Sequence, residues 1–81
     1  MTICVTFYSY FKELTSCAET KVDLPDGSTI AALLENLHVS FPRLKEMERS
    51  TLIAVGVEYQ DREYVLKEGD VVSLFPPVQG G

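Results

Sequence analysis

The middle of this chain contains one stripe of apolar residues at helical spacing, and this stripe limits the folds that are available to it. Pro25-Asp26-Gly27 is a turn signal before the stripe, Ser28 or Thr29 can cap the first helical turn, and Phe41-Pro42 ends the helix. A helix with one apolar face needs another layer of structure to cover that face. The stripe residues recur at i, i+3, i+4 and i+7: Ile30, Leu33, Leu34 and Leu37.

Segments with the period-2 alternation of half-buried strands lie on both sides of this helix. Lys12 to Ser16 is predicted as the turn of a hairpin, and Lys67 to Asp70 as a tight turn before the last strand. Arg43 to Met47 is predicted to form one more helical turn, with Leu44 facing inward. The predicted strands, of which the fourth is a short edge strand, cover residues 2–10, 18–24, 52–57, 63–65 and 71–75.

The order of these elements predicts an α+β fold of the β-grasp type, a mixed sheet of four to five strands with one main helix packed on one face. The first and last strands should lie side by side and parallel. Alternation then places Tyr8 and Phe75 on the sheet face opposite the helix. Residues 1–81 are predicted to form a single domain, in which residues 75–81 are the strand end and an extended C-terminal tail. The side chains expected to face the helix are Ile3, Val5, Phe7, Val72 and Leu74.

The charge and hydropathy of the chain argue against two classes of partner. Twelve acidic and seven basic residues give a net charge of −5, and no Lys/Arg cluster is available to hold phosphates, so we expect no nucleic acid partner. The apolar runs are far shorter than the ~20 residues of a membrane-spanning helix, and the N-terminus lacks the order of a signal peptide. We therefore expect a cytoplasmic protein with no membrane partner.

The body of the chain lacks the residue patterns of a metal or catalytic site. Cys4 and Cys17 do not have the spacing of metal ligands or of a redox pair. His38 is the only histidine, and no nucleophile–base set can be assembled around it. Phosphate-binding loops and paired carboxylates in a recognisable frame are also missing. We expect that this chain binds no metal and no cofactor.

The C-terminal segment is the most distinctive feature for function. The chain ends in Phe75-Pro76-Pro77-Val78-Gln79-Gly80-Gly81. The prolines hold the first part of this tail extended, and the glycines have no side chain that would obstruct a narrow channel. The six residues after Phe75 can reach about 20 Å from the body. We interpret the carboxylate of Gly81 as the working group, which is presented to the active site of another protein.

Four motifs carry a resemblance to a known family: Phe11-Lys12-Glu13-Leu14, Leu52-Ile53-Ala54-Val55, the segment Leu66 to Val72, and the Pro-Pro-Val-x-Gly-Gly ending. On these motifs, and along its whole length, the chain resembles the MoaD/ThiS ubiquitin-like sulfur carriers. A diglycine end is common to such carriers, whereas the Pro-Pro-Val step is similar to the molybdopterin synthase branch. Gly56 departs from the asparagine that many relatives have at this position.

The resemblance implies a sulfur-carrier mechanism. A ubiquitin-activating-like adenylyltransferase would use ATP to adenylate Gly81, and a sulfur donor protein would convert the adenylate into a thiocarboxylate. Gly80 would keep the approach unobstructed. The large subunit of a heterotetrameric molybdopterin synthase would bind precursor Z (cyclic pyranopterin monophosphate) and supply the catalytic side chains. This chain would then be the non-catalytic, sulfur-donating subunit in molybdenum cofactor biosynthesis.

Two other functions remain open on the sequence. The first is a sulfur carrier for another product, such as thiamine, a tungsten cofactor, a thiolated nucleoside or a protein conjugate. The second is a non-covalent ubiquitin-like adaptor that uses only its sheet face. Lys12 matches a basic position of the family, but a solvated surface lysine is the interpretation that we favour. The residues expected to bind a partner are Tyr8, Lys12, Phe75, Pro76, Pro77 and Val78.

Overall fold

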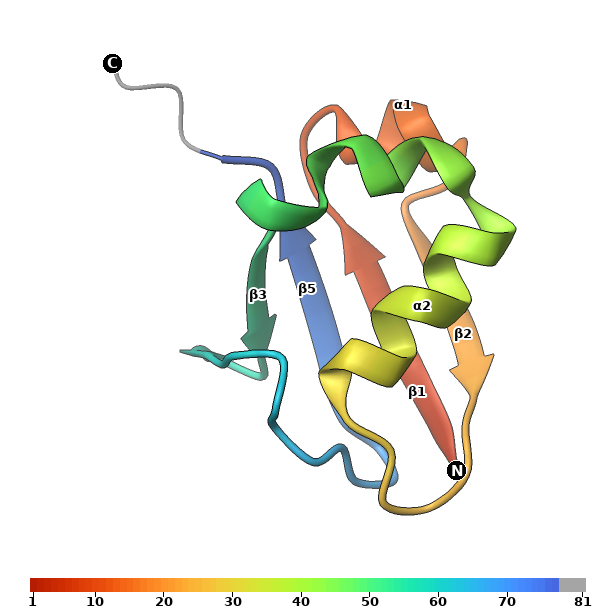
Figure 1. Ribbon diagram of the computed structural model, residues 1–81, viewed down its shortest axis with the longest axis vertical. Helices are drawn as coiled ribbons and strands as arrows, with labels where there is room; N and C mark the ends of the chain where they lie inside the picture. The colour runs from red at the N-terminus through yellow and green to blue at the C-terminus, as the bar shows by residue number, and fades with distance from the viewer. Residues whose placement is uncertain (78–81) are drawn as a thin grey trace.

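The computed structural model describes residues 1–77, which form a mixed five-stranded sheet with the main helix across one face (Figure 1). This arrangement is the β-grasp architecture that the sequence predicts. The elements in chain order are β1 (Thr2–Phe7), α1 (Phe11–Thr15), β2 (Glu19–Asp23), α2 (Ile30–Ser40), the 3₁₀ helix η1 (Pro42–Ser50), β3 (Leu52–Val55), β4 (Glu58–Tyr59) and β5 (Val71–Phe75).

The sheet has the strand order β2-β1-β5-β3-β4. Strands β1 and β5 are neighbours and parallel, with Cys4 opposite Val71 and Phe7 opposite Leu74. Strand β2 pairs antiparallel with β1, and β3 pairs antiparallel with both β5 and β4. The predicted parallel contact between the first and last strands is confirmed.

Helix α2 supplies one side of the core. Thr29 is its N-cap, and the Thr29 hydroxyl accepts a hydrogen bond from the Ala32 amide at 3.4 Å. All four residues of the predicted stripe are buried, and they pack in one cluster with the inward side chains of β1 and β5. Each large apolar side chain that is buried in this way contributes roughly 1.5–3 kcal/mol. The packing of α2 on the sheet is therefore a main source of stability.

The predicted turn at Lys12 to Ser16 is wrong, because the short helix α1 occupies this part of the chain. Phe11 and Thr15 lie one helical turn apart, and both are buried. The Thr15 hydroxyl donates to the Phe11 carbonyl at 3.0 Å, which satisfies the buried polar group. A single turn of helix is too short to show a period in the sequence, and only its packing against the core reveals it.

The predicted edge strand at residues 63–65 is also wrong, because the backbone of this segment binds the start of α2 instead of extending the sheet. The amides of Ile30 and Ala31 donate to the carbonyls of Tyr64 and Arg62, in both cases at 3.0 Å. The first N–H groups of a helix have no partner within the helix. Tyr64 in this segment and Arg62 just before it provide these partners, and Val65 forms only an isolated bridge to Thr29.

The edge of the sheet is formed by β4, which directly follows β3. Gly56 has a φ of 62° in the turn between them, a conformation that glycine adopts at no steric cost. The strand predicted over residues 52–57 therefore ends at Val55. Before β3 in the chain, η1 contains a kink at Met47, where φ is −110° and ψ is 15°. The helical turn predicted over 43–47 corresponds to the part up to this kink, and Leu44 is buried there as expected.

Leu33→Ala is expected to lower the free energy of unfolding by about 2–5 kcal/mol, because it removes a fully buried side chain and leaves a cavity. Val39→Ala on the same helix is the control, since Val39 is 83% exposed. That substitution should change the free energy by less than ~0.5 kcal/mol. Equilibrium unfolding in urea measures both. Equal, small effects in the two variants would contradict the packing of α2 on the sheet.

Candidate functional site

Two aromatic side chains lie face to face at the end of the sheet where β5 finishes. The rings of Tyr8 and Phe75 are stacked, with their centroids 4.6 Å apart and 13° between their planes. Tyr8 is 41% exposed and Phe75 is half-buried. Both lie on the face away from α2, since their chain neighbours Phe7 and Leu74 are buried in the core. The predicted placement of the two aromatics on the open face of the sheet is confirmed.

The backbone fixes Tyr8 on both sides. Its amide donates to the Leu74 carbonyl at 3.1 Å, one residue beyond the end of β1. Ser9 then adopts a left-handed φ of 53°, which is uncommon for a residue other than glycine, and the chain turns into α1. The first strand therefore ends at Phe7 rather than at residue 10 as predicted. The result is a tyrosine held at the edge of a sharp turn.

Further apolar side chains extend this site across the open face. Leu52 on β3 lies opposite Phe75, and Tyr59 on β4 lies opposite Ala54. Leu52 is 37% exposed and Tyr59 is 71% exposed. Grouped, exposed apolar side chains of this kind are typical of protein interaction sites. We call this set the open-face patch: Tyr8, Leu52, Tyr59, Val71 and Phe75.

Sequence reasoning found only part of the open-face patch. Val71 shares a strand face with Phe75 by simple alternation, so the pattern contained it. Leu52 and Tyr59 join the patch only through the register of β3 with β5 and of β4 with β3, which no local pattern contains. On the far side of β1, strand β2 carries charged side chains on the same face, and these bound the patch: Glu19, Lys21 and Asp23.

The other residues predicted to bind a partner lie in or near the tail. Pro76 and Pro77 follow β5 directly and are half-buried. Lys12 is exposed on α1, which lies at the same end of the sheet as the end of β5 (Figure 1). The stacked pair, the prolines and α1 thus lie at one end of the molecule. The remaining predicted site residues lie outside the described part of the chain: Val78, Gly80 and Gly81.

Among residues 1–77, the His, Cys, Asp and Glu side chains do not form any group of three or more that could hold a metal ion. Cys4 and Cys17 are free thiols. His38 lies near the end of α2 as expected, and its Nδ1 atom is 3.4 Å from Glu48 Oε1 on η1. This contact joins two helices. In the same part of the chain, we find no helix long and apolar enough to cross a membrane.

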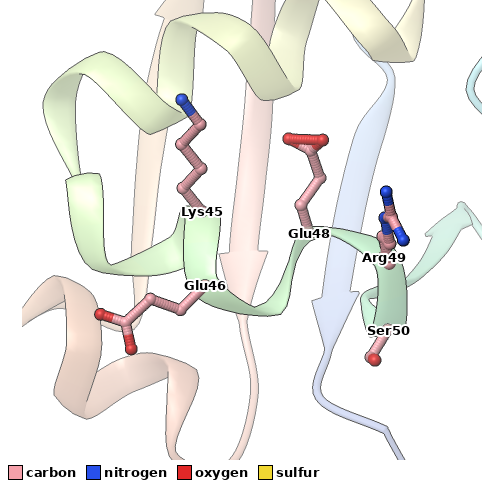
Figure 2. A pocket seen from close by; sticks show the side chains of 5 residues that line it. All are labelled: Lys45, Glu46, Glu48, Arg49 and Ser50. Carbon is pink, nitrogen blue, oxygen red and sulfur yellow. The ribbon is translucent and has the colours of Figure 1, made fainter.

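A hollow of about 400 Å³ lies over η1, and none of the residues that line it belongs to the open-face patch (Figure 2). Lys45 and Glu48 point toward α2 in Figure 2, whereas Glu46 points away from them. The lining side chains come from one element and carry charges of both signs, so the hollow does not bring together groups from different parts of the fold. They are Lys45, Glu46, Glu48, Arg49 and Ser50.

The turn before β5 holds its lysine as a cation. The Lys67 ammonium donates to the Tyr64 hydroxyl at 3.2 Å, and this hydrogen bond is the main cause that raises the pKa of Lys67 above its usual value. Electrostatic interactions with Tyr64 and Asp70 act in the same direction. Because Lys67 stays protonated at neutral pH, it is suited neither to nucleophilic attack nor to general-base catalysis.

Comparison with known proteins identifies the family. The model of the ThiS family matches residues 5–81, which is nearly the whole chain. The chain belongs to the ThiS family. The resemblance to the MoaD/ThiS carriers that the sequence motifs indicate is thereby confirmed.

Three relatives show how far the similarity extends. A molybdopterin synthase sulfur carrier subunit from Chlamydomonas reinhardtii is 32% identical over 84 aligned residues, which cover all of both chains. A putative molybdopterin converting factor, subunit 1, from Pyrococcus furiosus has a TM-score of 0.88 at 29% identity, covering 96% of this chain and 99% of that one. A chain in the complex of subunits 1 and 2 of the molybdopterin-converting factor from Helicobacter pylori has a TM-score of 0.72 at 30% identity and full coverage of both. The β-grasp fold is confirmed by these neighbours.

Proposed function

We propose that this chain is the sulfur carrier subunit of a molybdopterin synthase, in the biosynthesis of the molybdenum cofactor. The full-length similarity to a curated sulfur carrier subunit is the observation that carries the proposal. The structure adds physical support, since the last strand of the sheet leads into the proline-containing tail beside the stacked pair of Tyr8 and Phe75. We also propose a cytoplasmic location, as the sequence predicts.

The chemistry follows from the weakness of a carboxylate as an electrophile. An α-carboxyl group has a pKa near 3.5, so the Gly81 carboxylate is ionised at neutral pH and must be activated. An adenylyltransferase partner uses ATP for this step: the carboxylate attacks the α-phosphate, pyrophosphate leaves, and an acyl adenylate forms. The outer sulfur of a persulfide on a donor protein then attacks the acyl carbon and AMP leaves. A thiol attacks the donor's own sulfur in the resulting acyl disulfide, which breaks the S–S bond to the carrier and leaves a disulfide on the donor side. The product is a thiocarboxylate on Gly81, and Gly80 leaves room around it.

The large synthase subunit completes the reaction. It binds cyclic pyranopterin monophosphate and supplies the catalytic side chains, while this chain delivers sulfur and binds no cofactor itself. A dithiolene contains two sulfur atoms, so each product molecule consumes two charged carriers. We propose that the large subunit docks on the open-face patch, from which the tail can reach about 20 Å into its active site. Lys12, Pro76, Pro77 and Val78 would line the entry to that site.

Intact mass after isolation from cells tests the carrier chemistry directly. We expect a fraction of the protein in which one oxygen is replaced by sulfur, and fragmentation should map the exchange to the C-terminal peptide. Because Cys4 and Cys17 are free thiols in both forms, treatment with a sulfhydryl-reactive alkylating agent should add one more label to that species than to the carboxylate form, and the extra label should map to the C-terminal peptide. A protein that is never found with sulfur at its end, in cells that make the cofactor, would contradict the proposal.

Deletion of Gly81 is expected to abolish cofactor production completely, because the tail then ends one residue short of the activating and transfer sites. A full-length chain with a C-terminal amide is the matched control, since it keeps every residue and removes only the carboxylate. Both should fail in a reconstituted synthase assay, and both should unfold at the urea concentration of the wild type. Activity of the amidated chain would favour the adaptor alternative. A chain that accepts sulfur but does not convert the pterin precursor would favour a carrier for another product.

Phe75→Asp is expected to weaken binding to the large subunit by at least about tenfold, because it places a charge at the centre of an apolar interface. Val39→Asp is the control, since it introduces the same negative charge at an exposed valine on α2, which lies on the other side of the sheet. Its binding should match the wild type. Isothermal titration calorimetry gives both dissociation constants, and circular dichroism checks that each variant folds. Unchanged affinity of Phe75→Asp would remove the open-face patch from the docking model.

A further inference from the structure

The stacked pair of Tyr8 and Phe75 has a geometry that a docking surface alone does not require. We propose that this stack is a positioning device: it holds the base of the C-terminal tail in one orientation, so that Gly81 arrives in the active site of a partner at the correct angle. The proposal rests on the proposed sulfur-carrier function and specifies how the body takes part in it. Tyr8 acts through Phe75 and is a positioning residue, without contact to the reacting atoms.

The chain is stiff on the tail side of the stack. Phe75 pairs with Leu52 at the end of β5 and immediately precedes Pro76. A residue before proline is restricted to extended conformations, and each proline fixes its own φ near −65°. Three consecutive residues, Phe75 to Pro77, therefore have little freedom in their backbone. The orientation of this stiff segment depends on how firmly its first residue, Phe75, is held.

Tyr8 holds Phe75 from the neighbouring strand. The Tyr8 amide is bonded to the Leu74 carbonyl at 3.1 Å, and Ser9 directs the chain away at a left-handed φ of 53°. The tyrosine is thus fixed by backbone interactions that do not involve the tail. Its ring lies 4.6 Å from the Phe75 ring at an angle of 13°, so the two rings pack face to face. The left-handed serine is a local departure from preferred geometry that keeps the tyrosine beside the tail.

A small rotation of the backbone at Phe75 displaces the far end of the stiff segment. The stiff segment of three residues is about 10 Å long, so a rotation of about 6° at its base moves its end by about 1 Å. A misplacement of about 1 Å can reduce the rate of a reaction between bound groups by about a hundredfold. Loss of the stack should therefore slow the transfer step itself. A side chain that only contacts the partner would instead change the concentration at which the carrier saturates the synthase.

Tyr59 provides the comparison that separates these two roles. It belongs to the same open-face patch and is 71% exposed, yet it lies on the edge strand β4 opposite Ala54. Neither β4 nor Ala54 takes part in the stack or in the hydrogen bond that holds Tyr8. Truncating Tyr59 removes an aromatic contact surface and leaves the base of the tail unchanged.

The experiment compares wild type, Tyr8→Ala, Tyr8→Phe and Tyr59→Ala, each prepared chemically as the Gly81 thiocarboxylate so that the activating enzyme is bypassed. Each carrier is titrated against the cognate large subunit loaded with cyclic pyranopterin monophosphate. The single-turnover rate of sulfur transfer is measured at saturating carrier, and the half-saturating carrier concentration is measured separately. Circular dichroism and urea unfolding confirm that every variant is folded at the assay temperature.

We expect Tyr8→Ala to lower the saturating rate by about tenfold or more, and Tyr8→Phe to restore it to within about threefold of wild type, because the ring is retained. Tyr59→Ala should raise only the half-saturating concentration. A Tyr8→Ala variant with the wild-type saturating rate overturns the positioning role and leaves Tyr8 as a contact residue. If the wild-type thiocarboxylate transfers no sulfur to the pterin, the proposed function itself fails, which is a distinct result.

Discussion

The parallel pairing of β1 with β5 joins the beginning and the end of the described chain at the centre of the sheet. Strand β2 attaches to one side of this pair, and β3 attaches to the other side and carries β4 at its outer edge. The pairing also aligns Phe7 with Leu74, so that the two strands present their apolar side chains to α2 together. Because β5 lies in the interior of the sheet, its exit point is held by neighbours on both sides. The tail therefore leaves from one of the most firmly anchored parts of the fold.

The sheet divides the work of the molecule between its two faces. The face under α2 holds the buried cluster and supplies stability. The opposite face keeps several large apolar side chains partly exposed to water, among them Tyr8, Leu52 and Tyr59. This exposure adds no stability to a monomer, and it is typical of a protein interaction site. Since side chains alternate along a strand, each side chain of β5 lies either on the face that packs against α2 or on the open face. Leu74 stabilises the core, and the next residue, Phe75, joins the exposed patch.

A carrier of this kind needs a body that is rigid where the tail begins and that does not need reactive side chains elsewhere. The hydrogen bond from Lys67 to Tyr64 raises the pKa of the lysine. His38 contacts Glu48 between two helices. These titratable groups serve the structure of turns and helix contacts, which is consistent with a function that resides in the C-terminal carboxylate and in the surface beside it.

Much of this fold was predictable from the sequence because its signals are local. The four-residue stripe of α2, the alternation in β1 and β5, and the tail chemistry each lie within a few residues of one another, and backbone geometry translates such spacing directly into faces. The parallel contact and the aromatic pair followed from combining those faces. Tertiary structure alone decided the rest. Helix α1 depends on burial at the end of the sheet, and the backbone at Tyr64 accepts a hydrogen bond from the first turn of α2. Leu52 and Tyr59 belong to the patch because of the register between strands. These features depend on pairing between residues far apart in the chain, and the free energy of such pairing is not contained in any local pattern.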